Sequence, residues 1–203
     1  MPDGVDEVLE YWLGPEPTTT EQVQQRMKLW FGGGAETDRE IRERFTTLVQ
    51  KAKAGELDAW AETPRGTLAL VILLDQFTRN VYRGSPEAFV SDPKALALSR
   101  EGHLQGRFAS LGTFERMFAT MPLRHAEDVE AQKLGVALAV RDTLEAPELL
   151  RAFMVRSVDS ARDHLDVIVR FGRFPHRNAV LGRDSTPEEK EYLEYLKLAG
   201  QWL

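Results

Sequence analysis

The sequence predicts an all-α fold, because apolar side chains repeat at helical spacing along most of the chain. In one clear case the apolar residues recur at intervals of three or four positions: Leu111, Phe114, Met117, Phe118 and Met121. Runs in which apolar and polar residues alternate, which would indicate strands, are nearly absent. The chain therefore reads as a series of amphipathic helices.

Eight or nine helices are expected, over residues 4–13, 19–31, 36–54, 65–82, 92–105, 110–120, 126–144, 147–171 and 187–201. Apolar residues at helical spacing define the ranges 4–13, 36–54, 110–120 and 147–171. The turns between the ranges are short, and short turns favour antiparallel neighbours. We therefore predict antiparallel helix pairs.

Start signals define other ranges. Asp92-Pro93 and Thr186-Pro187 each place a polar residue before a proline, which is typical of a cap followed by the first helical position. The range 126–144 carries acids in its first turn, where they complement the helix dipole. We expect Asp92 and Thr186 to cap the helices that they precede.

The range 65–82 differs from the others in its first half. The run LALVILL, Leu68 to Leu74, is apolar on every face, which is typical of a helix buried on all sides. The polar string DQFTRN follows without a break. We predict a central helix whose second half ends at a polar site or cleft.

The bulk composition excludes several classes of protein. A net charge of −6 argues against non-specific nucleic-acid binding, which needs a basic surface. The longest apolar run is too short to span a membrane, and the acidic N-terminus lacks the basic and apolar regions of a signal peptide. With no cysteine and no linker in 203 residues, we predict a single cytoplasmic helical domain over residues 1–203.

Two Arg-rich segments are the first candidate sites. In DQFTRNVYRG, Arg79 and Arg83 are four residues apart, with Asn80 between them. Like charges at this spacing repel unless an acid or an anionic ligand lies between them. The segment therefore indicates either ion pairs to neighbouring helices or a fork that binds a carboxylate or phosphate.

The second segment, FGRFPHRNAVLGR, places Arg173, His176, Arg177 and Asn178 in one loop, because Gly172 can end the preceding helix. These side chains either cap helix ends or bind an anion. A short similarity links the two segments: both run from Phe to Arg-Asn and reach a glycine four residues after the Asn. One hypothesis is that Arg79 and Arg177 face each other across one site.

His125, in MPLRHAEDVEAQ, is the third candidate. It precedes three acids, and with Glu127 it could act as an acid/base pair. The spacing lacks the i, i+4 geometry of HExxH, so no metal is expected. His164, within the range 147–171, reads as structural, and no nucleotide-binding, P-loop or nucleophile-elbow motif occurs. The sequence indicates no cofactor.

Three segments resemble the motifs of a bacterial family of uncharacterised proteins, domain-of-unknown-function family 924: LLDQFTRNVYRG, PLRHAEDVEAQ and RFGRFPHRNAVLGRDSTPEE. GELDAWAETPRGTLALVILLDQF and VLEYWLGPEP also fit, so the resemblance covers about residues 5 to 198. The family usually has proline after DQF, where this chain has Thr78. The resemblance implies a fold similar to tetratricopeptide repeats, a right-handed superhelix of antiparallel helix pairs, and it brings no activity, substrate or cofactor.

Three functions follow from these residues. The first is a tetratricopeptide-like module that binds an acidic peptide or another anionic group through Arg79, Asn80, Arg83 and His125, and through the loop 173–178. The second is an enzyme or sensor for a small anionic metabolite, with a histidine as general acid or base. The third is a purely structural polar network. The partner is a peptide or a small anion, and the sequence does not reveal the oligomeric state.

Overall fold

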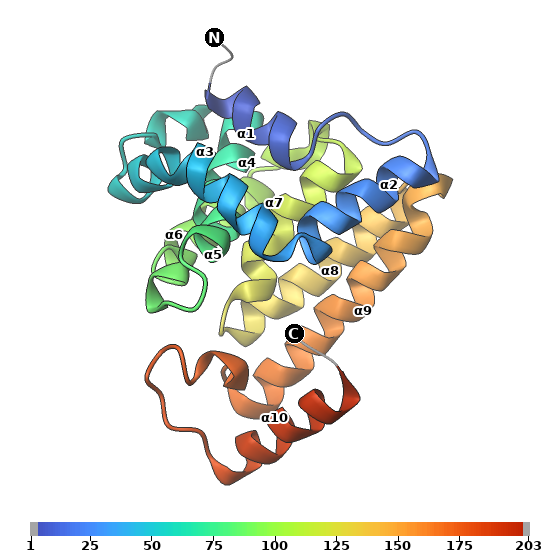
Figure 1. The fold of residues 1–203 in the computed structure, drawn as a ribbon. Coiled ribbons are helices and arrows are strands. Elements are labelled where there is room, and N and C mark those ends of the chain that lie inside the picture. The colour runs from blue at the N-terminus through green and yellow to red at the C-terminus, as the bar shows by residue number, and fades with distance from the viewer. Residues whose placement is uncertain (1–3, 201–203) are drawn as a thin grey trace.

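A computed structural model describes residues 4–200, and within them the chain forms helices and turns and no strand. The all-α prediction is confirmed. The helices, shown in Figure 1, are α1 Gly4–Trp12, α2 Thr20–Met27, α3 Gly34–Ala54, α4 Pro64–Val71, α5 Thr78–Val81, α6 Asp92–Leu104, α7 Thr113–His125, α8 Val129–Glu145, α9 Glu148–Phe171 and α10 Pro187–Ala199.

Two π-helical segments interrupt the regular geometry. Lys28–Gly32 continues α2, and Ile72–Phe77 joins α4 to α5 without a break. Counting α4, this second segment and α5 as one helix gives nine helices within residues 4–200, as the sequence predicts. The predicted end of the last helix, residue 201, lies outside the described residues.

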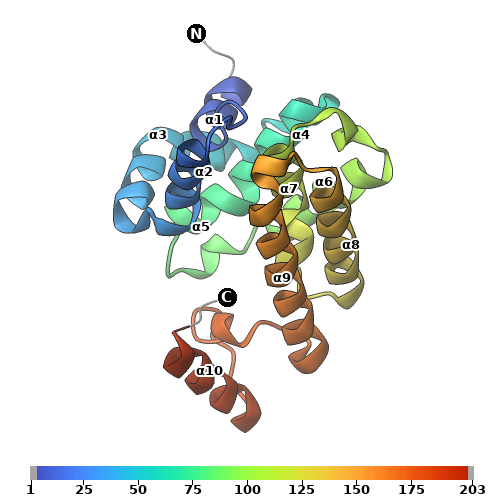
Figure 2. The same cartoon turned by 90° about the vertical axis from the view of Figure 1, so that its right-hand side faces the viewer.

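Helices α6 to α9 lie side by side, each packed against the one before it (Figures 1 and 2). The turns that join α7 to α8 and α8 to α9 are only a few residues long, so these neighbours run antiparallel. Helix α10 lies at one end of the molecule, beyond the end of α9, and packs on the short turn Pro175–Arg177. No helix within residues 4–200 has the length and hydrophobicity that crossing a membrane requires.

The helix from Pro64 to Val81 is the centre of the core. Every residue from Leu68 to Leu74 is fully buried, which confirms the interpretation of that run as a helix covered on all sides. Helices α1, α3, α6 and α7 surround it. Aromatic rings close the packing where Phe77 contacts Trp12 and Phe45. The core therefore fixes the segment that carries Asp75 and Arg79.

The boundary between α7 and α8 differs from the prediction. Helix α7 continues through Pro122 to His125, so His125 ends one helix and does not begin the next. Gln132, fully buried, satisfies this helix end: its Nε2 donates to the carbonyl oxygens of Arg124 at 2.6 Å and Ala126 at 2.8 Å.

Asp92 does not cap α6. It is the first residue of that helix, and its carboxylate accepts hydrogen bonds from Arg79 at 3.0 and 3.1 Å. The cap at Thr186 is confirmed, because its hydroxyl accepts from the backbone N–H of Glu189 at 3.2 Å. The capping interpretation of Asp92 is wrong because Arg79, 13 residues earlier in the sequence, binds its carboxylate.

Candidate functional site

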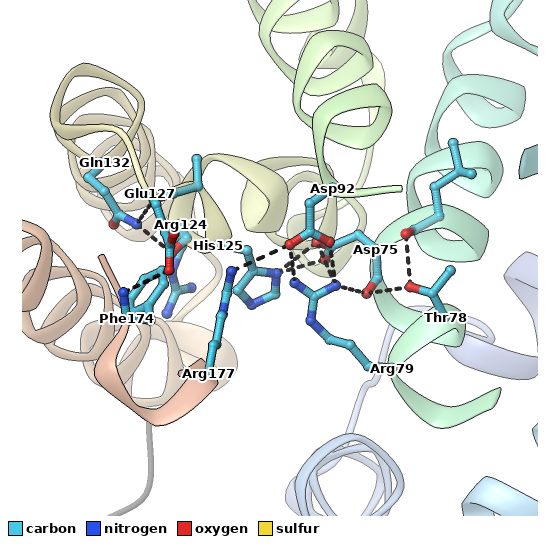
Figure 3. Close-up of polar contacts among 12 residues, drawn as sticks. Asp75, Thr78, Arg79, Asp92, Arg124, His125, Glu127, Gln132, Phe174 and Arg177 are labelled. Carbon is cyan, nitrogen blue, oxygen red and sulfur yellow. Dashed lines mark hydrogen bonds and ion pairs between the residues drawn. The ribbon is translucent and has the colours of Figure 1, made fainter. Parts of the chain in front are cut away.

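A chain of polar contacts links the central helix, α6, α7 and the loop after α9 (Figure 3). Nδ1 of His125 lies 2.8 and 2.9 Å from the two carboxylate oxygens of Asp75. Arg79 binds Asp92 through both terminal nitrogens, and Nη1 of Arg177 approaches the same carboxylate at 3.5 Å. Arg79 and Arg177, from segments almost a hundred residues apart, therefore meet at Asp92, as the internal similarity suggested.

Asp75 is the buried end of this chain. It lies in the π-helical segment Ile72–Phe77 and is fully buried. A π-helical turn is wider than an α-helical one and is frequent at functional sites. Asp75 also pairs with Arg79 at 3.2 Å, so one carboxylate serves a cation on its own helix and His125 at the end of α7.

The electrostatics of the chain follow from burial and pairing. Burial favours the neutral form of Asp75, but Arg79 and His125 outweigh it and hold the pKa of Asp75 well below its usual range. Burial raises the pKa of Asp92 to about 6, and its arginine partners offset this only in part. Burial lowers the pKa of His125 to about 4, so its imidazole is neutral at pH 7.

A pocket of ≈ 350 Å³ lies where these segments meet, and we call it the basic pocket. Among the described residues, its lining contains six basic side chains and no acidic one: Arg79, Arg83, His125, His164, His176 and Arg177. Gly84, Ala88 and Phe89 complete the lining. Five of the eight predicted site residues therefore line one pocket, together with His164, which the sequence had indicated as structural.

The other two histidines of the basic pocket are also held neutral. Burial, with smaller effects from Arg124 and His125, lowers the pKa of His164 to about 3. Burial and the neighbouring Arg177 lower the pKa of His176 to about 4. The lowered histidine pKa values follow from the arginines and from the low polarity of the pocket, which both disfavour additional positive charge.

Arg177 is the most buried cation of the pocket, with 7% of its surface exposed. Its guanidinium lies over the rings of Phe174, 4.4 Å from the centroid, and Phe89, at 5.0 Å. Its Nε has no hydrogen-bond partner among residues 4–200, and burial lowers its pKa to about 10. Its ion pair with Asp92 is long, so Arg177 retains unused donors.

The remaining predicted residues lie in internal networks. Arg83 and Asn80 both bind Asp38 of α3, with Nη2 and Nδ2 each 2.8 Å from Oδ1. Arg83 also lines the basic pocket, whereas Asn80 does not. These two contacts attach the end of the central helix to α3.

Arg173 and Asn178 bind Glu189 of α10. Arg173 donates to both carboxylate oxygens, at 2.7 and 2.9 Å, and Nδ2 of Asn178 donates at 3.1 Å. Arg183, in the same loop, binds both oxygens of Glu127 at 2.7 and 2.9 Å. Much of the positive charge in this loop is therefore neutralised by the protein, and neither Arg173 nor Asn178 lines the basic pocket.

Sequence reasoning missed Arg124, which is adjacent to His125 in MPLRH. It is 4% exposed and donates to Ser157 and Ser160 of α9, at 3.0 and 2.9 Å. The available signal was an arginine among the apolar residues of a helix. Within residues 4–200 no group of three or more histidine, aspartate or glutamate side chains is arranged to hold a metal ion.

The family model described as "Bacterial protein of unknown function (DUF924)" matches residues 8–196. The chain belongs to this family. A solved structure, a protein of unknown function designated ATU0120 from Agrobacterium tumefaciens, is similar at 32% sequence identity with a TM-score of 0.77. The alignment covers 94% of this chain and 97% of that one. Among proteins with curated descriptions, none matches this sequence.

Proposed function

We propose that this protein binds a small anion, a carboxylate or a phosphate, in the basic pocket. The observation that carries the proposal is the lining: six basic side chains from four parts of the chain enclose ≈ 350 Å³, and none of the described residues that line it is acidic. Arginine is well suited to planar bidentate recognition of both anions. Arg177 is buried with an unused Nε and supplies the strongest single reason to expect an anion.

His125 gives the pocket the means to exchange a proton with its ligand. Because a carboxylate only accepts hydrogen bonds, the nitrogen that faces Asp75 carries the hydrogen, and Nε2 is the free acceptor. An imidazole oriented by a buried carboxylate in this way can act as a general base when a bound anion raises its pKa from about 4. We therefore favour a small anionic metabolite as the ligand, bound by an enzyme or a sensor.

A peptide-binding module remains the second candidate. The antiparallel packing of α6 to α9 is in keeping with a tetratricopeptide-like superhelix within one domain, which the family resemblance implies. The ligand's carboxylate would then be the terminus or an acidic side chain of a peptide. The small volume of the basic pocket favours a free anion over an extended chain.

Thermal unfolding against a panel of inorganic phosphate, small carboxylates and acidic peptides tests the proposal. A ligand at a hundred times its dissociation constant stabilises the fold by roughly 2.7 kcal/mol. We expect one class to stabilise the wild type and to lose this effect in Arg177→Gln. The matched control is Arg39→Gln, since Arg39 is 66% exposed on α3, away from the pocket.

Affinity as a function of pH sharpens the test. A bound anion raises the pKa of the neutral pocket histidines from about 4, so binding takes up protons and affinity increases as the pH falls toward 4. Isothermal titration calorimetry in buffers of different ionisation enthalpy measures this uptake. The proposal is wrong if every anion stabilises Arg177→Gln as much as the wild type.

A further inference from the structure

A second and larger cleft, of ≈ 890 Å³, lies between α7, α9, α10 and the end of α2. This volume is within the range of small-molecule sites. One wall is apolar, with Met117 and Met121 of α7, Phe153 of α9, and Met27 and Phe31 at the end of α2. His125 and His164 line both this cleft and the basic pocket, so the two cavities are adjacent.

Arg124 lines the cleft together with the two serines that it binds. Ser157 and Ser160 are both neutral partners on α9. A guanidinium has five N–H donors, and among residues 4–200 only two of those of Arg124 find an acceptor. No carboxylate of the described residues lies within 4.0 Å of it, whereas Arg79, Arg83 and Arg177 each have one.

A buried cation without an anionic partner is costly. Taking a charged group out of water is unfavourable by several kcal/mol unless an opposite charge compensates it. Burial lowers the pKa of Arg124 to about 10, which expresses the same cost. The two serine hydroxyls hold the guanidinium in one orientation. The buried carboxylate of Asp75 compensates its charge only in part, and neither Asp163 nor Asp166, which also line the cleft, pairs with it within 4.0 Å. Arg124 therefore keeps unused donors for an anion that enters the cleft.

We propose that this cleft binds a carboxylic acid with an apolar tail. The carboxylate binds Arg124 beside Ser157 and Ser160, and the tail packs along the methionines and phenylalanines toward Phe31. A single planar fork matches one carboxylate, whereas a phosphate group carries more charge than one arginine compensates. Methionine and aromatic side chains adapt to alkyl or aryl chains of different shape. This site goes beyond the proposed function and does not depend on it.

Calorimetric titration of the wild-type protein with octanoate tests the proposal, and 1-octanol is the matched ligand without the charge. We expect saturable binding of octanoate and binding of the alcohol that is weaker by roughly tenfold or more, because charge-assisted hydrogen bonds to Arg124 are lost. Inorganic phosphate, which fits only the basic pocket, should not displace octanoate.

Three variants locate the site. Arg124→Gln should weaken octanoate roughly tenfold or more and remove the preference over 1-octanol. Arg116→Gln is the control, since Arg116 lies on the same helix and pairs with Asp142 outside the cleft. Phe31→Ser, at a side chain that is 61% exposed, should weaken octanoate without disturbing folding.

Each outcome decides the question. Equal affinity for octanoate and 1-octanol in the wild type, or no saturable octanoate binding, would overturn the proposal even if Arg124→Gln fails to fold. Unchanged octanoate affinity in a folded Arg124→Gln protein would overturn it as well. Because Arg177→Gln should retain octanoate binding, failure of the basic pocket as an anion site leaves this result intact.

Discussion

Arg173 and Arg177 are four residues apart in the same loop, but they differ in burial and in ion pairing. Arg173 is 29% exposed and makes a two-pronged ion pair with Glu189. Arg177 is almost fully buried, and its one carboxylate contact, with Asp92, is 3.5 Å long. The better-paired arginine is therefore the more exposed one.

Residue type and position therefore do not distinguish a structural arginine from a ligand-binding one. What distinguishes them is how far other residues of the protein neutralise the charge. Arg173 attaches the loop to α10 and is neutralised by it, so it has little left to offer a ligand. Arg177 shares Asp92 with Arg79 and keeps unused donors.

Asp75→Ala should have the largest effect on stability. The substitution leaves Arg79 and His125 without their buried partner, and breaking a buried pair costs about 3–5 kcal/mol. Urea unfolding measures the loss. The control is Asp6→Ala, because Asp6 pairs with Arg65 at the surface, with about half of each side chain exposed. Similar losses in both variants would contradict the assignment of Asp75 as the buried anchor.

Acid should destabilise the fold between pH 6.5 and 4. The pKa values of His125, His164 and His176 are lowered to about 4, 3 and 4, so unfolding takes up protons in this window. Stability is fully present above the unfolded pKa of about 6.5 and decreases by about 1.4 kcal/mol per pH unit for each histidine. Asp92, whose pKa is raised to about 6, offsets one of them.

The measurement is the free energy of unfolding from urea titrations at several pH values. His164→Gln should remove one proton from the uptake and flatten the profile. A profile that stays as steep in the variant would mean that His164 does not titrate as a buried neutral group.

Arg173→Ala and Arg177→Gln should separate stability from binding. Arg173→Ala removes the main partner of Glu189, which is 2% exposed, and should lower the urea midpoint. Arg177→Gln leaves Asp92 paired with Arg79, so its cost should be smaller than that of Arg173→Ala. The ligand panel should detect only the second change. If Arg177→Gln lowered the urea midpoint and Arg173→Ala abolished ligand binding, the division of the loop into a structural and a ligand-binding arginine would be wrong.

The smallest effect is expected at the surface pair of Arg170 and Glu188. Both side chains are more than half exposed, and such pairs contribute about 0–1 kcal/mol. Glu188→Gln should therefore change the urea midpoint little, and less at high salt. A large loss there would show that α10 depends on surface charge, and not on the buried contacts of Glu189.

The helices could be predicted because their apolar periodicity is local. The extension of α7 through Pro122 could not, since proline usually ends a helix and the compensating contact comes from Gln132 on the next one. The π-helical segment Ile72–Phe77 has no recognisable sequence pattern either, because its first three residues belong to the continuous apolar run Leu68–Leu74. Tertiary packing decided both.

The candidate site was predictable in its residue types and not in its partners. Arg79 and Arg177 stood out as clustered cations and His125 as a candidate acid/base, and all three line the basic pocket. The acids that distinguish scaffold from site are distant in sequence: Arg83 pairs with Asp38, 45 residues away. Ion pairs between residues so far apart cannot be inferred from a single sequence. Arg124 was missed because its burial and its lack of a carboxylate partner become visible only in the folded structure.

The π-helical segment gives the site a dependence on chain length. A π turn accommodates about one residue more than an α turn, so the segment Ile72–Phe77 holds an extra residue without the rotation of about 100° that each α-helical residue adds. Deleting that residue would restore a regular α-helix with Arg79 still directed toward Asp92. Inserting a further residue, which no widened turn absorbs, would turn everything beyond it by about 100° relative to Leu68, and Arg79 would face away from Asp92. The pocket therefore tolerates the loss of one residue here better than the gain of one.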